Sequence, residues 1–264
     1  MNKYGYTFLK EKYLQGESLS SIGRQYHCAP VWLRNKLKVE GINPPAFGSQ
    51  ARSGRKYQHN DTCFEKIDTE EKAYWLGFLY ADGSCHPSRG LVVISLAEKD
   101  KEHLDSFRKF ISPENKLEYL NKTKAYRLSI YDKKIHRDLV HLGCIPNKSL
   151  VLKFPTNNVV PDEFLHHFIR GYFDGDGCIH VNLEKKVYHF NVISSKSFLT
   201  DLQARFHQAV KGYTVTKLQN KGRAKCLMKG SKKQVLSLFE YLYKNAHIYL
   251  ERKCDKFKTI LSPQ

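Results

Sequence analysis

The sequence predicts an α+β protein in which two similar halves follow a small all-helical unit. Three observations support this prediction. A nine-residue apolar pattern ending in Asp-Gly occurs twice, helical and strand periodicities then alternate in the same order after each copy, and the first 42 residues show helical periodicity alone. We therefore expect a helical unit, a linker and two halves at residues 1–42, 43–65, 66–155 and 156–264.

The repeated pattern is WLGFLYADG at residues 75–83 and IRGYFDGDG at residues 169–177. In each copy two small residues lie four positions apart, and so on one face of a helix. They are Gly77 with Ala81, and Gly171 with Gly175. A glycine destabilises a helix by about 1 kcal/mol relative to alanine. Small residues repeated along one helix face, here called the glycine stripe, therefore indicate a packing requirement. We expect the two helices to pack with no side chain between their backbones.

Each copy ends in an acid followed by a glycine, Asp82-Gly83 and Asp176-Gly177. Gly177 suits the left-handed position that stops a helix, which leaves Asp176 at the negative end of the helix dipole. A carboxylate there is unfavourable unless a cation offsets it. One Asp-Gly pair is typical of a turn, but its repetition predicts that both acids meet across a pseudo-twofold axis and share divalent metal ions.

The charge of the chain predicts a polyanionic partner. Lysine and arginine number 44 against 26 acidic residues, a formal net charge of +18. Nucleic acid is favoured over a membrane, since no apolar run approaches the roughly 18 residues that span a bilayer. We expect a cytoplasmic protein of a bacterial or phage nucleoid, with an organelle as the alternative. The seven scattered cysteines indicate reduced thiols, not a disulfide or zinc framework.

Three short helices are predicted over residues 6–42, with a tight connection before the third. The basic third helix makes this arrangement typical of a helix-turn-helix, in which Arg34, Lys36 and Lys38 contact DNA. A small three-helix bundle with a charged surface is the alternative. The linker contains Arg52, Arg55 and Lys56, which either follow a phosphate backbone or belong to a solvated tether.

The two halves are predicted to contain the same elements in the same order. In the first half, a helix, a strand, an amphipathic helix, a hairpin and a helix are expected at residues 70–81, 91–97, 99–111, 116–131 and 133–142. In the second half, a helix, a hairpin, a helix, a hairpin and a helix are expected at residues 162–175, 178–194, 198–210, 215–229 and 232–244. Each half therefore combines helices with an antiparallel sheet.

With both nine-residue copies in register, residues 66–260 resemble the LAGLIDADG homing endonucleases, and specifically the monomeric members that carry two motifs. The resemblance implies two αββαββα halves whose motif helices form the interface, with saddle-shaped antiparallel sheets straddling the DNA major groove. One departure is visible. The acid at the sixth motif position is Asp174 in the second copy, but Tyr80 occupies that position in the first.

The resemblance also implies the chemistry of the site. The eighth motif residues, Asp82 and Asp176, would bind two or three divalent ions with the carbonyls of Ala81 and Gly175, and oxygen-only ligands favour Mg²⁺. Two further stretches resemble the segments that deliver a basic residue to the site. They nominate Lys148 and Lys253 as catalytic residues, with Arg252 as the alternative to Lys253. The implied product is a double-strand break with short 3′ overhangs.

Side chains for DNA recognition are predicted from strand alternation, because alternate residues share a face of a sheet. The alternation predicts that Leu128 and Ile179 face inward, together with Ala224, Cys226 and Met228. The predicted DNA contacts are then Arg89, Arg127, Ser129, His180, Asn182, Lys217, Gln219, Arg223, Lys225 and Lys229.

The leading hypothesis is a monomeric, site-specific double-stranded DNA endonuclease. Because the halves differ in sequence and in length between acid and lysine, we expect a long, non-palindromic target. Two alternatives use the same fold without this activity. They are a transcription regulator that binds DNA without cutting it, and a maturase that binds intron RNA. Intact Asp82 and Asp176 argue against the regulator, but not against the maturase.

Overall fold

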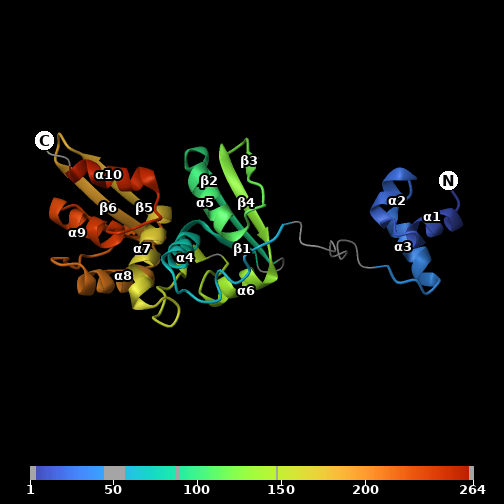
Figure 1. Ribbon diagram of the computed structural model, residues 1–264, viewed down its shortest axis with the longest axis horizontal. Coiled ribbons are helices and arrows are strands. Elements are labelled where there is room, and N and C mark those ends of the chain that lie inside the picture. Colours follow the sequence, from blue (N-terminus) through green and yellow to red (C-terminus); the bar gives the residue numbers. More distant parts are fainter. Residues whose placement is uncertain (1–3, 45–56, 87–89, 147, 262–264) are drawn as a thin grey trace. The chain divides into compact units, whose positions relative to one another are not determined.

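The computed structural model describes residues 4–44, 57–86, 90–146 and 148–261. The chain divides into two compact units, Met1–Lys56 and Tyr57–Gln264, here called unit 1 and unit 2. Unit 2 has the predicted α+β architecture, with two four-stranded antiparallel sheets (Figure 1). Among the described residues, no helix is both long enough and apolar enough to cross a bilayer.

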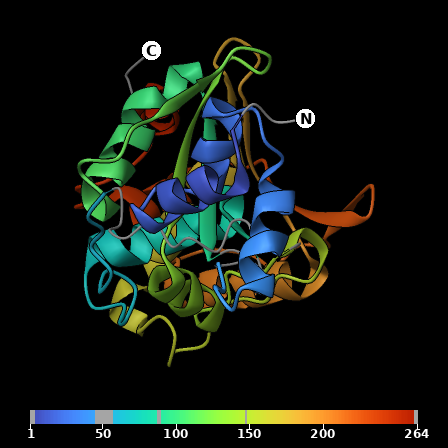
Figure 2. The ribbon, with the colours of Figure 1, turned by 90° about the vertical axis from the view of Figure 1, so that its right-hand side faces the viewer.

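Unit 1 contains the three helices expected over residues 6–42 (blue in Figures 1 and 2), namely α1 (Tyr6–Leu14), α2 (Leu19–Gln25) and α3 (Pro30–Val39). Ser18 caps α2 by accepting a hydrogen bond from a backbone N–H of its first turn. Pro30 begins α3, where the missing N–H costs nothing. Leu9, Ile22 and Leu33 are fully buried and close a small core of their own.

The predicted linker is shorter than expected at its C-terminal end. Cys63 and Phe64 are each 1% exposed and join the core of unit 2. The Asn60 N–H donates to the Ile111 carbonyl (2.9 Å), which fixes this segment on the first half. Residues 57–65 were assigned to the linker because they contain few apolar residues, but two buried ones are enough to anchor them. The linker arginines and lysine lie outside the described residues.

The first half of unit 2 forms one antiparallel sheet in the order β1-β2-β4-β3. Its elements in chain order are α4 (Glu70–Asp82), β1 (Ser84–His86), β2 (Leu91–Ala97), the 3₁₀ turn η1 (Glu98–Asp100), α5 (Lys101–Ile111), β3 (Glu118–Leu120), β4 (Ala125–Tyr131), α6 (Lys133–His141) and η2 (Lys148–Leu150). Strand β1 was not predicted, since three residues are too few to show a periodicity.

The second half repeats this arrangement, with strand order β5-β6-β8-β7. Its elements are α7 (Asp162–Asp176), β5 (Gly177–Asn182), β6 (Val187–Ser194), α8 (Lys196–Ala209), β7 (Gln219–Lys221), β8 (Ala224–Lys229), α9 (Lys232–Tyr243) and α10 (Glu251–Leu261). Helix α10 was not predicted, because the segment was interpreted only as the carrier of a lysine.

The strand predicted at residues 215–219 is wrong; β7 begins only at Gln219. The Gln203 side chain replaces the missing sheet partner. Its Oε1 accepts from the Thr216 N–H (3.0 Å), and its Nε2 donates to the Thr216 carbonyl (3.1 Å). A side chain can thus provide the hydrogen bonds that extended backbone needs outside a sheet. The alternation of polar and apolar residues does not distinguish such a segment from a strand.

Helices α4 and α7 lie side by side between the two sheets (Figure 1) and form the interface of the halves. A Cβ atom on Gly77 would lie 2.0 Å from the Phe168 carbonyl oxygen, and one on Gly171 would lie 2.0 Å from the Tyr74 carbonyl oxygen. The two contacts are related by the pseudo-twofold axis. The predicted reason for the glycine stripe is therefore confirmed.

The glycines that follow the two acids have a different role from the one predicted. Gly83 and Gly177 are extended (φ −74° and −80°), not left-handed. A Cβ on Gly83 would lie 2.6 Å from the Leu79 carbonyl oxygen, and one on Gly177 would meet the Phe173 ring. These glycines let the chain fold back over the last helical turn without a clash.

Gly77→Ala should destabilise unit 2 by about 3 kcal/mol, because the new methyl group has to push two backbones apart. Chemical denaturation of the full chain measures this change. Gly230→Ala is the matched control, since its Cβ would meet only the Tyr188 carbonyl oxygen at 3.7 Å. Equal stabilities for the two variants would show that the interface is not close-packed.

Candidate functional site

Asp82 and Asp176 are the last residues of α4 and α7. A Cβ atom built on Gly175, the residue before Asp176, would lie 3.3 Å from Asp82 Oδ2. The end of one helix is thus in contact with the acid of the other. Both acids remain accessible to solvent, although surrounding protein crowds each carboxylate.

The surroundings make both negative charges unfavourable. Desolvation first, and then the charge of Asp176, raise the pKa of Asp82 to about 6. Desolvation also raises the pKa of Asp176, and the positive charges of Lys148 and Lys253 oppose this shift. The fold therefore holds two acids where they repel each other and are only partly neutralised. A divalent cation would stabilise both carboxylates.

Lys253, from α10, lies at the C-terminal end of α7 and is 4% exposed. Its Nζ donates to the carbonyls of Phe173 (2.7 Å), Asp174 (2.7 Å), Gly175 (3.2 Å) and Gly177. Burial lowers its pKa to about 8. The ammonium group thus caps the helix whose last residue is Asp176.

Lys148 has the corresponding place in the first half, since its Nζ donates to the Gly83 carbonyl just beyond α4. The two predicted basic residues therefore lie beside the two acids, each bonded to backbone oxygens. Arg252, the alternative to Lys253, is engaged elsewhere. Its guanidinium binds both oxygens of Asp100 in the first half (2.7 and 2.9 Å).

The donor atoms at the helix ends fit a hard divalent cation such as Mg²⁺. In the part of the chain that the structure describes, no three His, Cys, Asp or Glu side chains gather as a metal cluster. Two carboxylates would need backbone carbonyls and water or phosphate oxygens to complete a six-oxygen shell. Of the predicted carbonyl ligands, that of Ala81 lies in the last turn of α4. The carbonyl oxygen of Gly175 would be shared between a cation and Lys253.

Asp174, the sixth residue of the second motif, is a structural acid. Its carboxylate is 1% exposed and accepts hydrogen bonds from the Tyr74 hydroxyl (2.8 Å), the Tyr243 hydroxyl (2.6 Å) and the Leu250 N–H (2.7 Å). Its counterpart Tyr80 donates to the Leu142 carbonyl. In both halves the sixth residue thus connects the motif helix to the segment that precedes the lysine.

A buried ion pair that sequence reasoning missed joins the halves. Arg170 is fully buried and donates to Glu70 Oε1 (2.6 Å) and to the carbonyls of Leu242 and Ile248 (2.8 and 2.9 Å). Glu70 also accepts from the backbone and ring N–H groups of His247. A signal was present in the sequence, since the motif position of Arg170 is Leu76 in the first copy.

Burial along the strands separates an inner face of each sheet, against the helices, from an outer face. Arg127 and Ser129 pair with Ser95 and Val93 on the outer face of the first sheet. On the second sheet, His180 lies on the outer face, opposite His189. Asn182 and Gln219 have the same parity, through their partners Val187 and Cys226.

Lys225 and Lys229 do not lie on that outer face, because they have the same parity as the fully buried Leu227 and so belong to the inner face. Lys229 is 3% exposed, donates to the Thr214 carbonyl and lies 4.2 Å from the centre of the Tyr213 ring. The prediction placed Ala224, Cys226 and Met228 inward because three apolar residues alternate there. The fully buried residue is the intervening Leu227, so the faces were exchanged.

The remaining predicted contacts are scattered. Lys217 precedes β7, and Arg223 lies in the β7–β8 turn. Lys36 and Lys38 are exposed on α3, whereas Arg34 is half-buried; Arg89 lies outside the described residues. Strand alternation did not predict the exposed lysines at the hairpin ends as DNA contacts, because it applies only to residues within strands. These lysines are Lys122, Lys124, Lys185, Lys186 and Lys221.

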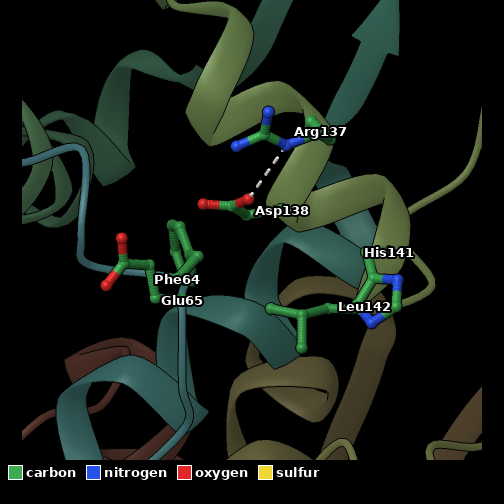
Figure 3. A pocket seen from close by; sticks show the side chains of 6 residues that line it. All are labelled: Phe64, Glu65, Arg137, Asp138, His141 and Leu142. Carbon is green, nitrogen blue, oxygen red and sulfur yellow. Dashed lines mark ion pairs between the residues drawn. The ribbon is translucent and has the colours of Figure 1, made fainter.

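Among the described residues, the acid pair lines none of three hollows of the surface. A hollow of about 190 Å³ lies between residues 64–65 and α6, where Arg137 pairs with Asp138 (Figure 3). Neither of the acids lines this hollow, nor the two hollows beside α9. The solvent-accessible position of the acids suits a substrate larger than the hollows of the protein.

Asp82→Asn should stabilise the protein in metal-free buffer at pH 7.5 and leave it unchanged at pH 4. An acid whose pKa is raised on folding contributes stability at low pH, which is lost as pH rises towards 6. The shift corresponds to about 3 kcal/mol, which screening at this exposed group reduces to about 1 kcal/mol. Denaturant titrations at both pH values measure the difference.

Asp174→Asn is the matched control, because that acid accepts three hydrogen bonds from the protein. An amide nitrogen cannot accept them, so this variant should lose about 2 kcal/mol at pH 7.5. A loss of stability in Asp82→Asn at pH 7.5 would contradict the account of an unfavourable acid pair.

Comparison with known proteins agrees with this arrangement. Residues 163–242 match the model of a family described as LAGLIDADG-like domain. No curated protein sequence matches the chain. The fold is similar to that of meganuclease I-SmaMI bound to uncleaveable DNA with a TTGT central four, with a TM-score of 0.50, 10% identity, and coverage of 74% of this chain and 90% of that chain.

Two further structures are similar to the same extent. The LAGLIDADG homing endonuclease I-GzeII in complex with its DNA target has a TM-score of 0.50, 12% identity, and coverage of 74% and 89%. A lysine-to-alanine mutant of I-SmaMI has a TM-score of 0.51, 11% identity, and coverage of 72% and 90%. At these identities the likeness concerns the fold. The chain therefore has a fold similar to that of these LAGLIDADG proteins, and its residues 163–242 match the LAGLIDADG-like domain.

Proposed function

We propose that this protein is a site-specific endonuclease, which binds double-stranded DNA and hydrolyses one phosphodiester in each strand with Mg²⁺. The observation that carries the proposal is the pair of acids, Asp82 and Asp176, which the contacting helices hold together although their charges are unfavourable. A protein that only binds nucleic acid would be weakened by two acids beside phosphates that its own lysines only partly neutralise, whereas a metal-dependent nuclease requires such acids.

Charge and shape both support DNA as the substrate. The chain has a net charge of +18, the acids are open to solvent, and both sheets have outer faces with polar side chains. Structures of the same fold are described as bound to DNA, among them I-SmaMI and I-GzeII. We expect the outer faces to contact base edges in the major groove, and the hairpin lysines to contact phosphates.

In the proposed mechanism Asp82 and Asp176 would hold two or three divalent cations, together with the Ala81 and Gly175 carbonyls. The bound cations would supply a nucleophilic hydroxide and neutralise the charge of the transition state. Lys148 and Lys253 hold the helix ends and add positive charge near the scissile phosphates. Cleavage on both sides of the axis would leave short 3′ overhangs.

The asymmetry of the two halves supports a non-palindromic target. The outer face of the first sheet offers Ser95, Arg127 and Ser129, whereas that of the second offers histidines and amides such as His180 and Asn182. Two unlike faces contact two unlike half-sites. Because one chain carries both motifs, we propose that it acts as a monomer.

Unit 1 would add a second DNA contact. Arg24 on α2 and Lys36 and Lys38 on α3 are exposed, and α3 follows α2 after a short turn. We propose that this arrangement acts as a helix-turn-helix. Such a unit increases affinity without taking part in the chemistry.

Replacement of either acid should abolish cleavage. A library of DNA fragments is first screened with the protein in Mg²⁺, and the ends are mapped to define the target. On that target, Asp82→Asn and Asp176→Asn should each lower the cleavage rate by at least about 10³-fold, since each removes several kcal/mol of charge stabilisation. DNA affinity in Ca²⁺ should be preserved.

Asp201→Asn, an exposed substitution on α8, is the matched control and should cut normally. Cleavage that survives both acid substitutions would refute the site. Binding of DNA without cleavage by the unmodified chain would favour a regulator. Tighter binding to a folded intron RNA than to any DNA would favour a maturase.

Substitution of both exposed lysines of α3, Lys36→Ala with Lys38→Ala, should reduce the slope of log affinity against log salt by about 2. Each lost phosphate contact removes about one released counterion. Filter binding at several salt concentrations measures the slope. Lys244→Ala, next to α9, is the control. An unchanged slope in the double variant would exclude α3 from the DNA interface.

A further inference from the structure

In the second half, one row of side chains crosses the sheet beside the acid. The residue after Asp176 begins β5, and it pairs with the residue before Ile193 in β6, so Ile193 lies beside the acid. Ile193 pairs with Cys226 of β8, and Cys226 pairs with Gln219 of β7. Ile193, Cys226 and Gln219 are here called the second row.

A matching row crosses the sheet of the first half. Strand β1 begins two residues after Asp82, and there it pairs with the residue two positions before Ser95, so Ser95 lies beside the acid. Ser95 pairs with Arg127 of β4, and Arg127 pairs with Glu118 of β3. Ser95, Arg127 and Glu118 are here called the first row. Because both sheets have the same strand order, the pseudo-twofold axis relates the two rows strand by strand.

Both rows lie on the outer faces of the sheets, and the acids are exposed on the same side. Ser95 and Ile193 are exposed, and each lies between two buried residues of its strand. In both halves the acid is exposed as well, whereas the glycine that follows it is buried. A DNA duplex whose scissile phosphates reach the acids would therefore pass over both rows.

The first row carries side chains that suit a G·C pair. Arg127 Nε donates to Ser95 Oγ (3.3 Å), so one of the five N–H donors of the guanidinium is held on the sheet. The two terminal nitrogens form the pair of donors that binds O6 and N7 of guanine together. Glu118, exposed on the next strand, offers an acceptor for N4 of cytosine.

The second row carries side chains that suit an A·T pair. Ile193 is 37% exposed and offers an aliphatic surface to the C5-methyl group of thymine. Gln219 is exposed, and its amide can bind N6 and N7 of adenine together. Cys226 lies between them, is half-buried and adds a small apolar surface. No residue of the second row is charged, so none of them can replace Arg127 at a guanine.

We propose that the two rows determine unlike base pairs at mirror-related positions of the target, a G·C pair at the first row and an A·T pair at the second. The inference rests on the proposed function and specifies part of its substrate. The two half-sites would then differ at this position because one row is charged and the other is not.

The test is a selection by binding, which does not depend on cleavage. The full chain is mixed in Ca²⁺ with a library of randomised DNA duplexes, and the bound duplexes are sequenced. The unmodified chain is compared with Arg127→Ala and with the double variant Ile193→Ala and Gln219→Ala. The replaced side chains are exposed or half-buried, so both variants should keep the melting temperature of the unmodified chain.

We expect the unmodified chain to select G·C at one position and A·T at the mirror-related position. Replacing the selected G·C pair by A·T should lower its DNA affinity by about ten- to hundredfold, the value of one bidentate contact. In Arg127→Ala the same replacement should lower the affinity by less than about threefold. The double variant should lose only the preference for A·T at the mirror-related position.

Arg137→Ala is the matched control. Its side chain is 72% exposed and lies on α6, outside both sheets. Loss of this arginine should leave every base preference in place. The comparison therefore separates contact with a base from the general effect of removing a positive charge.

The inference is overturned if Arg127→Ala keeps the preference for G·C, or if it weakens binding to all sequences equally, as the loss of a phosphate contact would. It is also overturned if the two variants lose preferences at positions that are not mirror-related. Failure of the proposed function has a different signature. The unmodified chain would then bind DNA with these base preferences but would not cut the selected duplex in Mg²⁺.

Discussion

The contact between the backbones of α4 and α7 is the constraint on which the rest of the structure depends. Gly77 and Gly171 place each helix against carbonyl oxygens of the other, and this approach is possible only without side chains. The helix ends then have to meet. Two acids that lie 94 residues apart in the sequence become neighbours, and the sheets of both halves are oriented by the helices between them.

A site built in this way needs stabilisation at both ends of the helix pair. About three turns before Asp82, the buried pair of Glu70 and Arg170 joins the halves. At the end with the acids, Lys148 and Lys253 bind carbonyl oxygens, and Arg252 binds Asp100 across the interface. The acids are thus held by contacts that do not involve their own carboxylates, which leaves these oxygens available to a ligand.

Features that occur in both halves could be predicted from the sequence, because a pattern that occurs twice rarely arises by chance. These features are the glycine stripes, the acid pair and the order of the elements. The predictions that were wrong concern single strands. The inward face of β8 is decided by Leu227 alone, and three neighbouring apolar residues concealed it. The bonds between Gln203 and Thr216 replace a strand through one side chain.

Hydrogen-bond and ion-pair partners that are distant in the sequence, and that occur in only one half, could not be predicted. The bond between Arg170 and Glu70 joins residues 100 positions apart, and no second copy exists because the first motif has Leu76 at that place. The difference between the copies at that position is visible in the sequence, but without coordinates it shows neither the partner of Arg170 nor the direction of the bond.

The four carbonyl oxygens around Lys253 have a consequence for how the molecule folds. They belong to residues 76–80 positions earlier in the chain, and until α10 docks the end of α7 lacks its cap. A chain in which α10 has not docked therefore lacks the lysine beside Asp176, so it does not contain the complete site.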